Sequence, residues 1–170
     1  MGRALKKYYD STGRNPTRVV VHKSSTFLED EQAGFNKAIY GLEIPEKDFV
    51  AIRQSHGWIN FVRLGNYPVL RGTLIEITDN EFLLYSSGYS PRIRSYAGHR
   101  IPNPLRITHI GDSQNEEVAK EILGLTKLNW NTTAFSTAVP ITIKFAEGVG
   151  RILSELAEDK ALQDHYRFFM

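Results

Sequence analysis

The sequence contains no cysteine, which excludes disulfide bonds, thiol catalysis and zinc or iron–sulfur centres ligated by cysteine. It has no run of about 18 consecutive apolar residues, the length that a transmembrane helix needs. Residues 1–8 lack the apolar core of a signal peptide. The 21 Lys and Arg against 19 Asp and Glu give a net charge of +2, so bulk charge does not indicate a nucleic-acid partner. These absences predict a soluble, cytoplasmic protein with no membrane partner.

Familiar catalytic motifs are also missing. The 5 histidines include no pair with the HxxxH spacing of a metal site, and the chain has no GxSxG, GxGxxG or P-loop segment. Neighbouring acidic residues such as Glu116 and Glu117 are typical of helix N-termini, where the helix dipole favours negative charge. Residue chemistry alone therefore names no enzyme class.

The 170 residues suffice for one domain with a real hydrophobic core. Ser113 is expected to be the N-cap of one helix, and Pro140 to lie in the first turn of another. Residues 86–104, rich in Gly and Pro, are expected to form an extended loop. Apolar periodicity predicts an α+β or mixed α/β class, with helices at 3–9, 29–40, 113–127 and from 140, and strands at 18–22, 48–53, 60–64, 69–77, 81–85 and 104–110.

The strand expected at 18–22 bears on the completeness of the domain. Its sequence, RVVVH, is β-branched and apolar on both faces, which is typical of a buried central strand. Such a strand needs neighbours on both sides, and the downstream strands supply one side only. We therefore expect residues 1–170 to form a single, incomplete domain that is finished by a larger architecture or by a partner chain.

Three regions of the chain are more specific when they are taken together. They read PTRVVVHKSS at 16–25, RLGNYPVLRGT at 63–73 followed by GYSP at 88–91 and IPNPL at 101–105, and LTKLNWNTT at 125–133 followed by VPITIKFAE at 139–147. In this order they resemble the C-terminal half of the PIWI domain of prokaryotic Argonaute proteins. The resemblance covers essentially the whole chain, and LTKLNWN and PITIKFA are its most specific parts.

The resemblance implies an α/β fold of the ribonuclease H-like (PIWI) type, a mixed sheet flanked by helices. The strand at 18–23 would be the fourth of that fold, and the helix from Pro140 would close it. The first three strands and the MID domain would precede residue 1, in the same protein or in a partner chain. The implied function is binding of a guide nucleic acid, DNA or RNA, that directs recognition of a complementary target.

The resemblance also bears on cleavage. Family members that cut use acidic residues to hold two Mg²⁺ ions, and these hard cations require charged oxygen ligands. The third acidic position falls on Ser24, whose neutral hydroxyl is a poor substitute. The fourth falls on Glu147, or on Ile143 if the alignment shifts. The resemblance thus implies the cleavage-inactive type, with a guided endonuclease completed by its missing half and a degenerate structural fragment as the alternatives.

Glu147 also has a purely structural interpretation. Lys144 precedes it by three residues and Arg151 follows by four, so the three side chains could form a row of surface ion pairs along one helix.

Guide phosphates need Lys, Arg, amide and hydroxyl donors along a groove. Residues 127–133 supply a dense cluster of such donors, although Asn and Thr in a turn can equally cap neighbouring backbone groups. Lys144 and Arg151 are seven residues apart, which places both on one face of the closing helix. The candidate nucleic-acid-binding residues are Lys127, Asn129, Asn131, Thr133, Lys144, Arg151 and, as a weaker candidate, Arg71.

The last six residues, HYRFFM, are too apolar and aromatic for a free tail. In the family such an end packs between the PIWI and MID domains, and its carboxylate helps to bind a divalent ion at the guide 5′-phosphate. The resemblance therefore implies that the main-chain carboxylate of Met170 is a Mg²⁺ ligand.

Overall fold

The computed structural model describes residues 1–55, 69–92, 95–96, 102–129 and 135–155. The helices are α1 (Gly2–Thr12), α2 (Glu29–Ile39), α3 (Asn115–Leu125) and α4 (Ile141–Glu155). The strands are β1 (Arg18–Lys23), β2 (Glu46–Gln54), β3 (Leu74–Thr78), β4 (Glu81–Leu84), β5 (Tyr89–Ser90), β6 (Ser95–Tyr96) and β7 (Leu105–Gly111). None of the helices in these ranges is long and apolar enough to cross a membrane.

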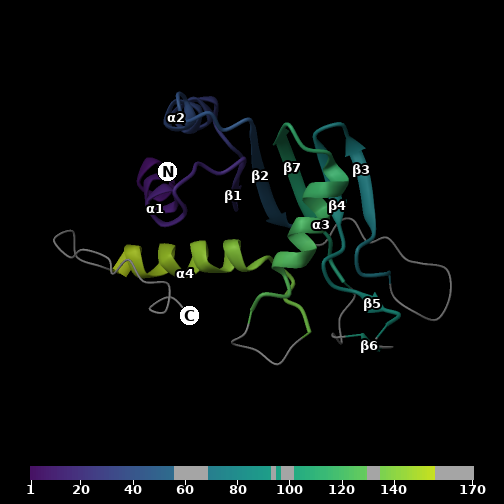
Figure 1. Ribbon diagram of the computed structural model, residues 1–170. Helices are drawn as coiled ribbons and strands as arrows, with labels where there is room; N and C mark the ends of the chain where they lie inside the picture. The colour runs from purple at the N-terminus through teal and green to yellow at the C-terminus, as the bar shows by residue number, and fades with distance from the viewer. Residues whose placement is uncertain (56–68, 93–94, 97–101, 130–134, 156–170) are drawn as a thin grey trace.

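Five strands form a mixed sheet in the order β1-β2-β7-β4-β3 (Figure 1). β1 and β2 are parallel, and α2 makes the crossover between them that a parallel pair requires. The other three pairs of neighbouring strands are antiparallel. The fold is therefore mixed α/β, as the sequence predicts.

Different helices cover the two faces of the sheet. Along β2, Val50 and Ile52 pack into the core beneath α3, whereas Phe49 and Ala51 pack against the aromatic residues beside α2. This alternation is the period of two that a strand buried on both faces shows. The larger core consists of Val50, Ile52, Phe82, Leu84, Leu105, Ile107, Val118, Ala119, Ile122, Val139 and Ile143.

A buried carboxylate connects β1, β2, β7 and the segment before α3. Asp48 of β2 has no exposed surface, and it accepts hydrogen bonds from Arg18 Nε at 2.7 Å and His109 Nε2 at 2.8 Å. The backbone N–H and the hydroxyl of Ser113 donate to the same carboxylate at 3.1 and 2.8 Å. Burial alone would raise the pKa of Asp48, but the hydrogen bonds from these three residues lower it well below its usual range. Arg18 extends the network by pairing with Glu121 of α3.

Gly111 makes this packing possible. It lies opposite Asp48 in the β2–β7 pair. A Cβ atom at position 111 would lie 2.2 Å from Oδ1 of Asp48 and 2.5 Å from the carbonyl oxygen of Lys47. The close approach of the two strands at this point therefore requires glycine.

Most of the expected elements are confirmed, including the hairpin of β3 and β4 and the closing helix after Pro140. The first strand of the hairpin, expected at 69–77, is shorter and begins at Leu74. The expectation for Ser113 is wrong, because α3 begins at Asn115 after Gln114 and the Ser113 hydroxyl binds the buried Asp48 instead. The loop at 86–104 contains the short paired strands β5 and β6, so it is not wholly irregular. The strand expected at 60–64 lies outside the described residues.

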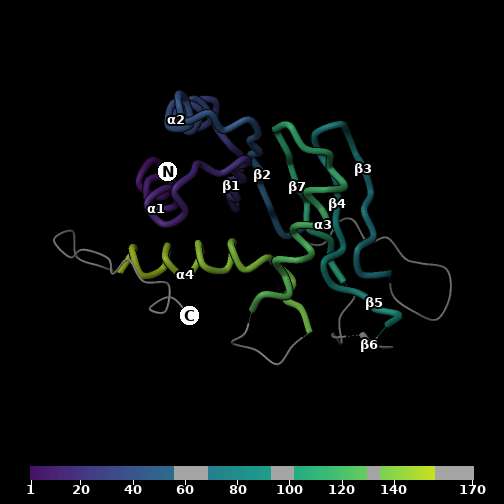
Figure 2. The backbone as a smooth tube through the Cα atoms, in the orientation of Figure 1, coloured from purple at the N-terminus to yellow at the C-terminus, as the bar shows by residue number. Residues whose placement is uncertain are grey.

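β1 lies at one edge of the described sheet, where β2 is its neighbour. Its six residues are all half-buried. Val20 packs against the core beneath α3 and Val21 against the aromatic cluster on the opposite face. Figure 2 shows α1 and α2 on one side of β1 and α4 on the other. The expected second neighbour of this strand is therefore not found among the described residues.

Candidate nucleic-acid interface

Ser24 follows β1 directly and is exposed, in the connection to α2. The adjacent Lys23 donates from Nζ to both carboxylate oxygens of Glu31 at 2.5 Å, and its Nζ lies 5.6 Å from the centre of the Phe27 ring. Glu31 also accepts a hydrogen bond from the N–H of Leu28, and this bond and the one from Lys23 lower its pKa. The contacts of Lys23 therefore fix the start of the Ser24 loop against α2.

The described residues do not assemble a metal site by themselves. Within the ranges that the structure describes, no group of three or more His, Asp or Glu side chains is placed to hold a metal ion. Ser24 supplies a neutral hydroxyl, and Mg²⁺ prefers charged oxygen ligands.

Glu147 lies on α4 with its side chain exposed, as do Lys144 and Arg151. The ion pairs found in the described part of the chain do not join Glu147 to either cation. The row of surface ion pairs suggested by their spacing is therefore not formed. Lys144 and Arg151 face solvent about 10 Å apart along the helix axis.

Lys127 and Asn129 lie just beyond the C-terminal end of α3. The Lys127 side chain is exposed, and its Nζ lies 5.2 Å from the centre of the Phe135 ring. Asn129 is half-buried. Three other predicted site residues, Asn131, Thr133 and the C-terminal Met170, lie outside the described residues.

Arg71 belongs to the same region, but much of its guanidinium serves the fold. Its Nη2 donates to the carbonyl oxygen of Leu123 at 3.1 Å and to the hydroxyl of Thr126, and its Nε donates to Ser136 at 3.3 Å. Burial lowers the pKa of Arg71. These bonds hold the end of α3 against the segment that leads into α4, and they leave Nη1 as the nitrogen that no described residue uses.

The segment before α4 is anchored at several points. The N–H of Thr137 donates to the carbonyl oxygen of Thr126 at 2.9 Å. The Thr137 hydroxyl donates to the carbonyl oxygen of Val139 at 2.6 Å. Ser86, two residues after β4, donates to the carbonyl oxygen of Ala138. We call residues 126–129 and 135–140 the α3–α4 junction. Figure 1 shows α4 beginning beside the C-terminal end of α3.

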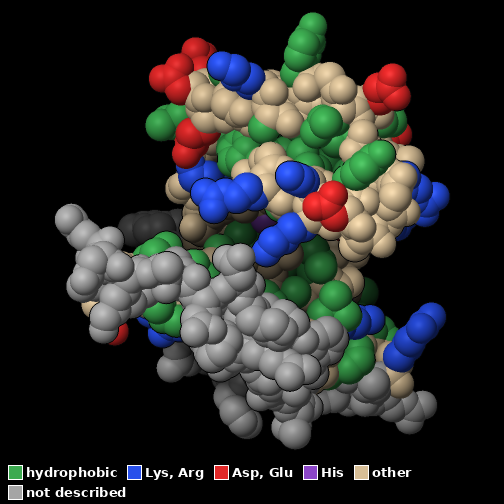
Figure 3. All heavy atoms as spheres, turned by 60° about the vertical axis from the view of Figure 1, so that its left-hand side comes forward, with side chains coloured by type: hydrophobic (Ala, Val, Ile, Leu, Met, Phe, Trp, Pro, Cys, Tyr) green, Lys and Arg blue, Asp and Glu red, His purple; other side chains and the backbone are tan. Residues whose placement is uncertain are grey.

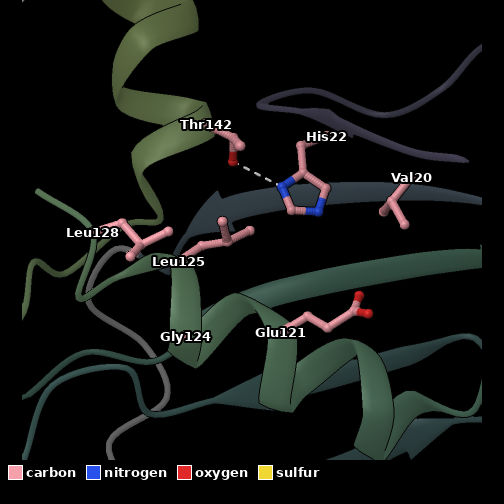
Figure 4. A pocket seen from close by; sticks show the side chains of 7 residues that line it. All are labelled: Val20, His22, Glu121, Gly124, Leu125, Leu128 and Thr142. Carbon is pink, nitrogen blue, oxygen red and sulfur yellow. Dashed lines mark hydrogen bonds between the residues drawn. The ribbon is translucent and has the colours of Figure 1, made fainter. Parts of the chain in front are cut away.

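A cavity of about 600 Å³ opens next to the α3–α4 junction, between β1, α3 and α4. Its lining is mostly apolar and consists of Val20, His22, Glu121, Gly124, Leu125, Leu128 and Thr142 (Figure 4). Figure 3, seen from the side of α1 and α4, shows hydrophobic side chains in a recess with Lys and Arg side chains along its upper border. The cavity thus adjoins the exposed edge of the sheet.

His22 is the polar group that β1 contributes to this cavity. Figure 4 shows its ring directed toward Thr142 of α4, and Nδ1 lies 2.8 Å from the Thr142 hydroxyl. Burial lowers the pKa of His22; the Glu121 carboxylate has a smaller effect that raises it, and the Arg18 guanidinium has a smaller effect that lowers it. The contact fixes the start of α4 against β1.

Phe135 is a residue of this region that the sequence did not indicate. Its side chain is 44% exposed, and both Arg71 and Lys127 lie close to its ring. The only signal in the sequence is an aromatic residue eight positions after a lysine. The contact with Arg71 becomes visible when the fold brings residues 71 and 135 together.

No family model matches this sequence, and no curated protein matches it. Solved structures do match its fold. Clostridium butyricum Argonaute, bound to a guide DNA and a 19-mer target DNA, superposes with a TM-score of 0.67 over 92% of this chain at 17% identity. Aa-Ago with externally bound siRNA superposes with a TM-score of 0.68 over 92% of this chain at 16% identity.

The matched region is a small part of those proteins. It amounts to 20% of the Clostridium butyricum chain and 21% of the Aa-Ago chain, so this chain spans about a fifth of their length. The five-stranded mixed sheet and its flanking helices correspond to that portion. The chain therefore has an Argonaute-like fold.

Proposed function

We propose that this chain is the C-terminal half of the PIWI domain of a prokaryotic, cytoplasmic Argonaute of the cleavage-inactive type, and that it binds the phosphates of a guide strand. The guide, DNA or RNA, would direct recognition of a complementary target. The observation that carries the proposal is the Argonaute-like fold over 92% of the chain. Because fold alone does not define function, the proposal also rests on particular side chains.

The candidate phosphate ligands are cations that the fold leaves available. Lys127, Lys144 and Arg151 are exposed, and the described residues give none of them an ion-pair partner. Exposed Lys and Arg side chains of this kind strengthen binding when they neutralise a phosphate, because counterions are released from the nucleic acid. Arg71 would add at most one hydrogen-bonding group, its Nη1. Asn129, Asn131 and Thr133 would donate hydrogen bonds from the segment between Lys127 and Lys144.

The open edge of β1 supports the proposal that another segment completes the domain. β1 offers backbone groups on one side and valine side chains on both faces. The apolar residues Phe145, Val149 and Ile152 of α4 are only half-buried, and Leu153 is 51% exposed. A strand added beside β1 would pair with its backbone and cover this apolar surface. The preceding part of a PIWI domain, from the same protein or a partner chain, is the proposed occupant.

The proposed inactivity rests on Ser24. A neutral hydroxyl leaves the repulsion between two closely spaced Mg²⁺ ions uncompensated. A single divalent ion would instead sit at the guide 5′-phosphate, with the Met170 carboxylate as a ligand, and would neutralise charge there. That carboxylate lies outside the described residues, so this part of the proposal depends on the resemblance.

The test measures the salt dependence of guide binding by the complete protein. Fluorescence anisotropy with 5′-phosphorylated single-stranded DNA and RNA gives the affinity between 50 and 300 mM salt, roughly the range over which phosphate binding weakens. A variant with Lys127→Ala, Lys144→Ala and Arg151→Ala should bind more weakly. Its log–log salt slope should fall by about 0.7–0.9 for each phosphate that is no longer neutralised. The weakening should be similar for all guide sequences, because phosphates carry no sequence information.

A matched control removes the same charge elsewhere. Arg14, Lys37 and Lys120 are exposed on the connection after α1, on α2 and on α3. Their triple alanine variant should keep the wild-type slope. Equal losses of affinity in both variants would indicate a bulk charge effect, and an unchanged slope in the first would show that the proposed ligands are wrong.

A further inference from the structure

Phe135 combines an exposed ring with a position directly before a well-anchored segment. The residues that follow it are held by Arg71, Thr126 and Ser86 through the hydrogen bonds of the α3–α4 junction. Its side chain nevertheless remains 44% exposed. An aromatic ring held in this way loses little conformational freedom when a flat apolar partner stacks on it.

Two cations lie beside the ring. The guanidinium carbon of Arg71 is 5.9 Å from the ring centre, and the Lys127 Nζ is 5.2 Å from it. Both distances are within the range of cation–π attraction. Arg71 is fixed by its hydrogen bonds to the junction, whereas the exposed Lys127 has a flexible four-carbon side chain and no ion-pair partner among the described residues.

Because its side chain is flexible, Lys127 can exchange its contact with the Phe135 ring for another contact. A cation–π contact at an exposed site is weak, about 0.5–1 kcal/mol, so a planar ligand can displace the Lys127 ammonium from the ring. The ammonium would then be free to pair with a phosphate next to that ligand. A nucleotide unit supplies both parts, because each base has a π-face and each is joined to a phosphate.

We propose that Phe135 is a stacking platform for one base of a bound single strand, with Lys127 exchanging its contact with the ring for a contact with an adjacent phosphate. The inference rests on the proposed function, and it adds a contact with a base to the phosphate contacts of that function. Every base offers a π-face, so the platform fixes the position of a nucleotide and does not read its identity.

The experiment compares Phe135→Ala with Phe135→Trp in the complete protein, using the same anisotropy assay. Removal of a base–aromatic stack weakens binding by about 5- to 150-fold. Phe135→Ala should fall in that range and keep the salt slope, because every phosphate ligand is retained. Phe135→Trp should bind at least as tightly as the wild type. Tyr40→Ala removes another highly exposed aromatic side chain, 90% exposed, and should leave binding unchanged.

A series of guides, each with one abasic site, locates the stacked base. At a single position the abasic guide should bind wild type and Phe135→Ala equally, because the stack is then absent from both. At every other position the difference between the two proteins should persist.

The outcomes separate this inference from the proposed function. If Phe135→Ala binds as tightly as wild type while the variant lacking Lys127, Lys144 and Arg151 loses affinity, the stacking platform is wrong and phosphate binding stands. If Phe135→Ala is weaker by the same factor with every abasic guide, no base stacks there and the inference is also wrong. If the wild-type protein binds no single strand, both proposals fall.

Discussion

Arg18 and Asp48 form an ion pair of 2.7 Å across the parallel strands β1 and β2, with the Asp48 side chain fully buried and the Arg18 side chain 16% exposed. A buried charge is tolerated only while its partners remain in place. The same carboxylate binds His109 and Ser113, so four segments of the chain depend on one residue. Asp48 therefore links β1, β2, β7 and the segment before α3.

Asp48→Asn should lower the free energy of unfolding by about 3–5 kcal/mol. The change keeps the shape of the side chain but removes the charge, and it replaces one of the two acceptor oxygens with an NH₂ group, so that either Arg18 or His109 loses its acceptor on this residue. Urea denaturation followed by circular dichroism measures the loss of stability. Glu116→Gln breaks the exposed pair with Lys120, whose side chains are 76% and 71% exposed, and should cost no more than about 0.5 kcal/mol. Similar losses in the two variants would contradict the central role of Asp48.

Asp48 should also make the free energy of unfolding decrease at acidic pH. The pKa of Asp48 is lower in the folded state than in the unfolded chain, where it is about 3.9. The unfolded state therefore takes up a proton first as the pH falls. The stabilisation from Asp48 is fully present above about pH 5 and is lost progressively below it. Urea midpoints measured at a series of pH values should converge for wild type and Asp48→Asn as the solution becomes acidic. A constant difference between them would contradict this linkage.

Gly111→Ala should destabilise the protein by about 3 kcal/mol, since the added Cβ would overlap the Asp48 carboxylate and the Lys47 carbonyl. Gly34 in α2 is the matched control, because nothing lies within 4 Å of a Cβ atom at that position. Gly34→Ala should raise stability by up to about 1 kcal/mol through helix propensity. Thermal unfolding of the two variants distinguishes them, and equal effects would show that β7 has room to move at Gly111.

The complete protein should not cleave a target paired to its guide. Ser24 cannot supply the negative charge that two Mg²⁺ ions require, and Mn²⁺, which tolerates looser geometry, is the more permissive ion to test. Denaturing gels of labelled DNA and RNA targets show whether product forms. Cleavage that disappears in Glu147→Ala would establish the guided nuclease instead. Ser24→Asp is a second check, because only a nearly intact site would gain activity from one carboxylate.

The isolated chain should self-associate through the open edge of β1 and the half-buried apolar face of α4. Light scattering should show species larger than a monomer, and a hydrophobic dye should bind. Addition of the preceding PIWI portion should reduce both signals. A monodisperse monomer that binds no dye would show that this surface is already covered.

The fold was largely accessible from the sequence because its signals are local. The β-branched run in β1, the turn between β3 and β4, and Pro140 before α4 each act within a few residues. Ser113 shows where that reasoning fails. Its position favours a helix cap, but its hydroxyl instead donates to the buried carboxylate of Asp48, which requires hydrogen-bond donors. The two residues are 65 positions apart in the sequence, so local patterns do not reveal this contact.

Part of the candidate site could also be predicted from the sequence, because some of its signals are local. Lys144 and Arg151 follow from helical spacing, and the structure leaves both exposed. Arg71 was expected only as a weaker phosphate ligand, and in the structure its guanidinium connects Leu123 of α3 to Ser136. Its contact with Phe135 depends on segments more than 60 residues apart, and a single sequence carries no signal for such a pair.

If a separate chain supplies a strand beside β1, the melting temperature of this chain will depend on the concentration of that partner. When the completing strand belongs to a separate chain, binding adds RT ln(1 + [L]/Kd) to the stability of the folded state, about 2.7 kcal/mol at a partner concentration 100 times Kd. Dilution would then lower the stability of the sheet without any change in temperature or solvent. When the strand belongs to the same protein, its effective concentration is fixed by the connection, and dilution has no effect.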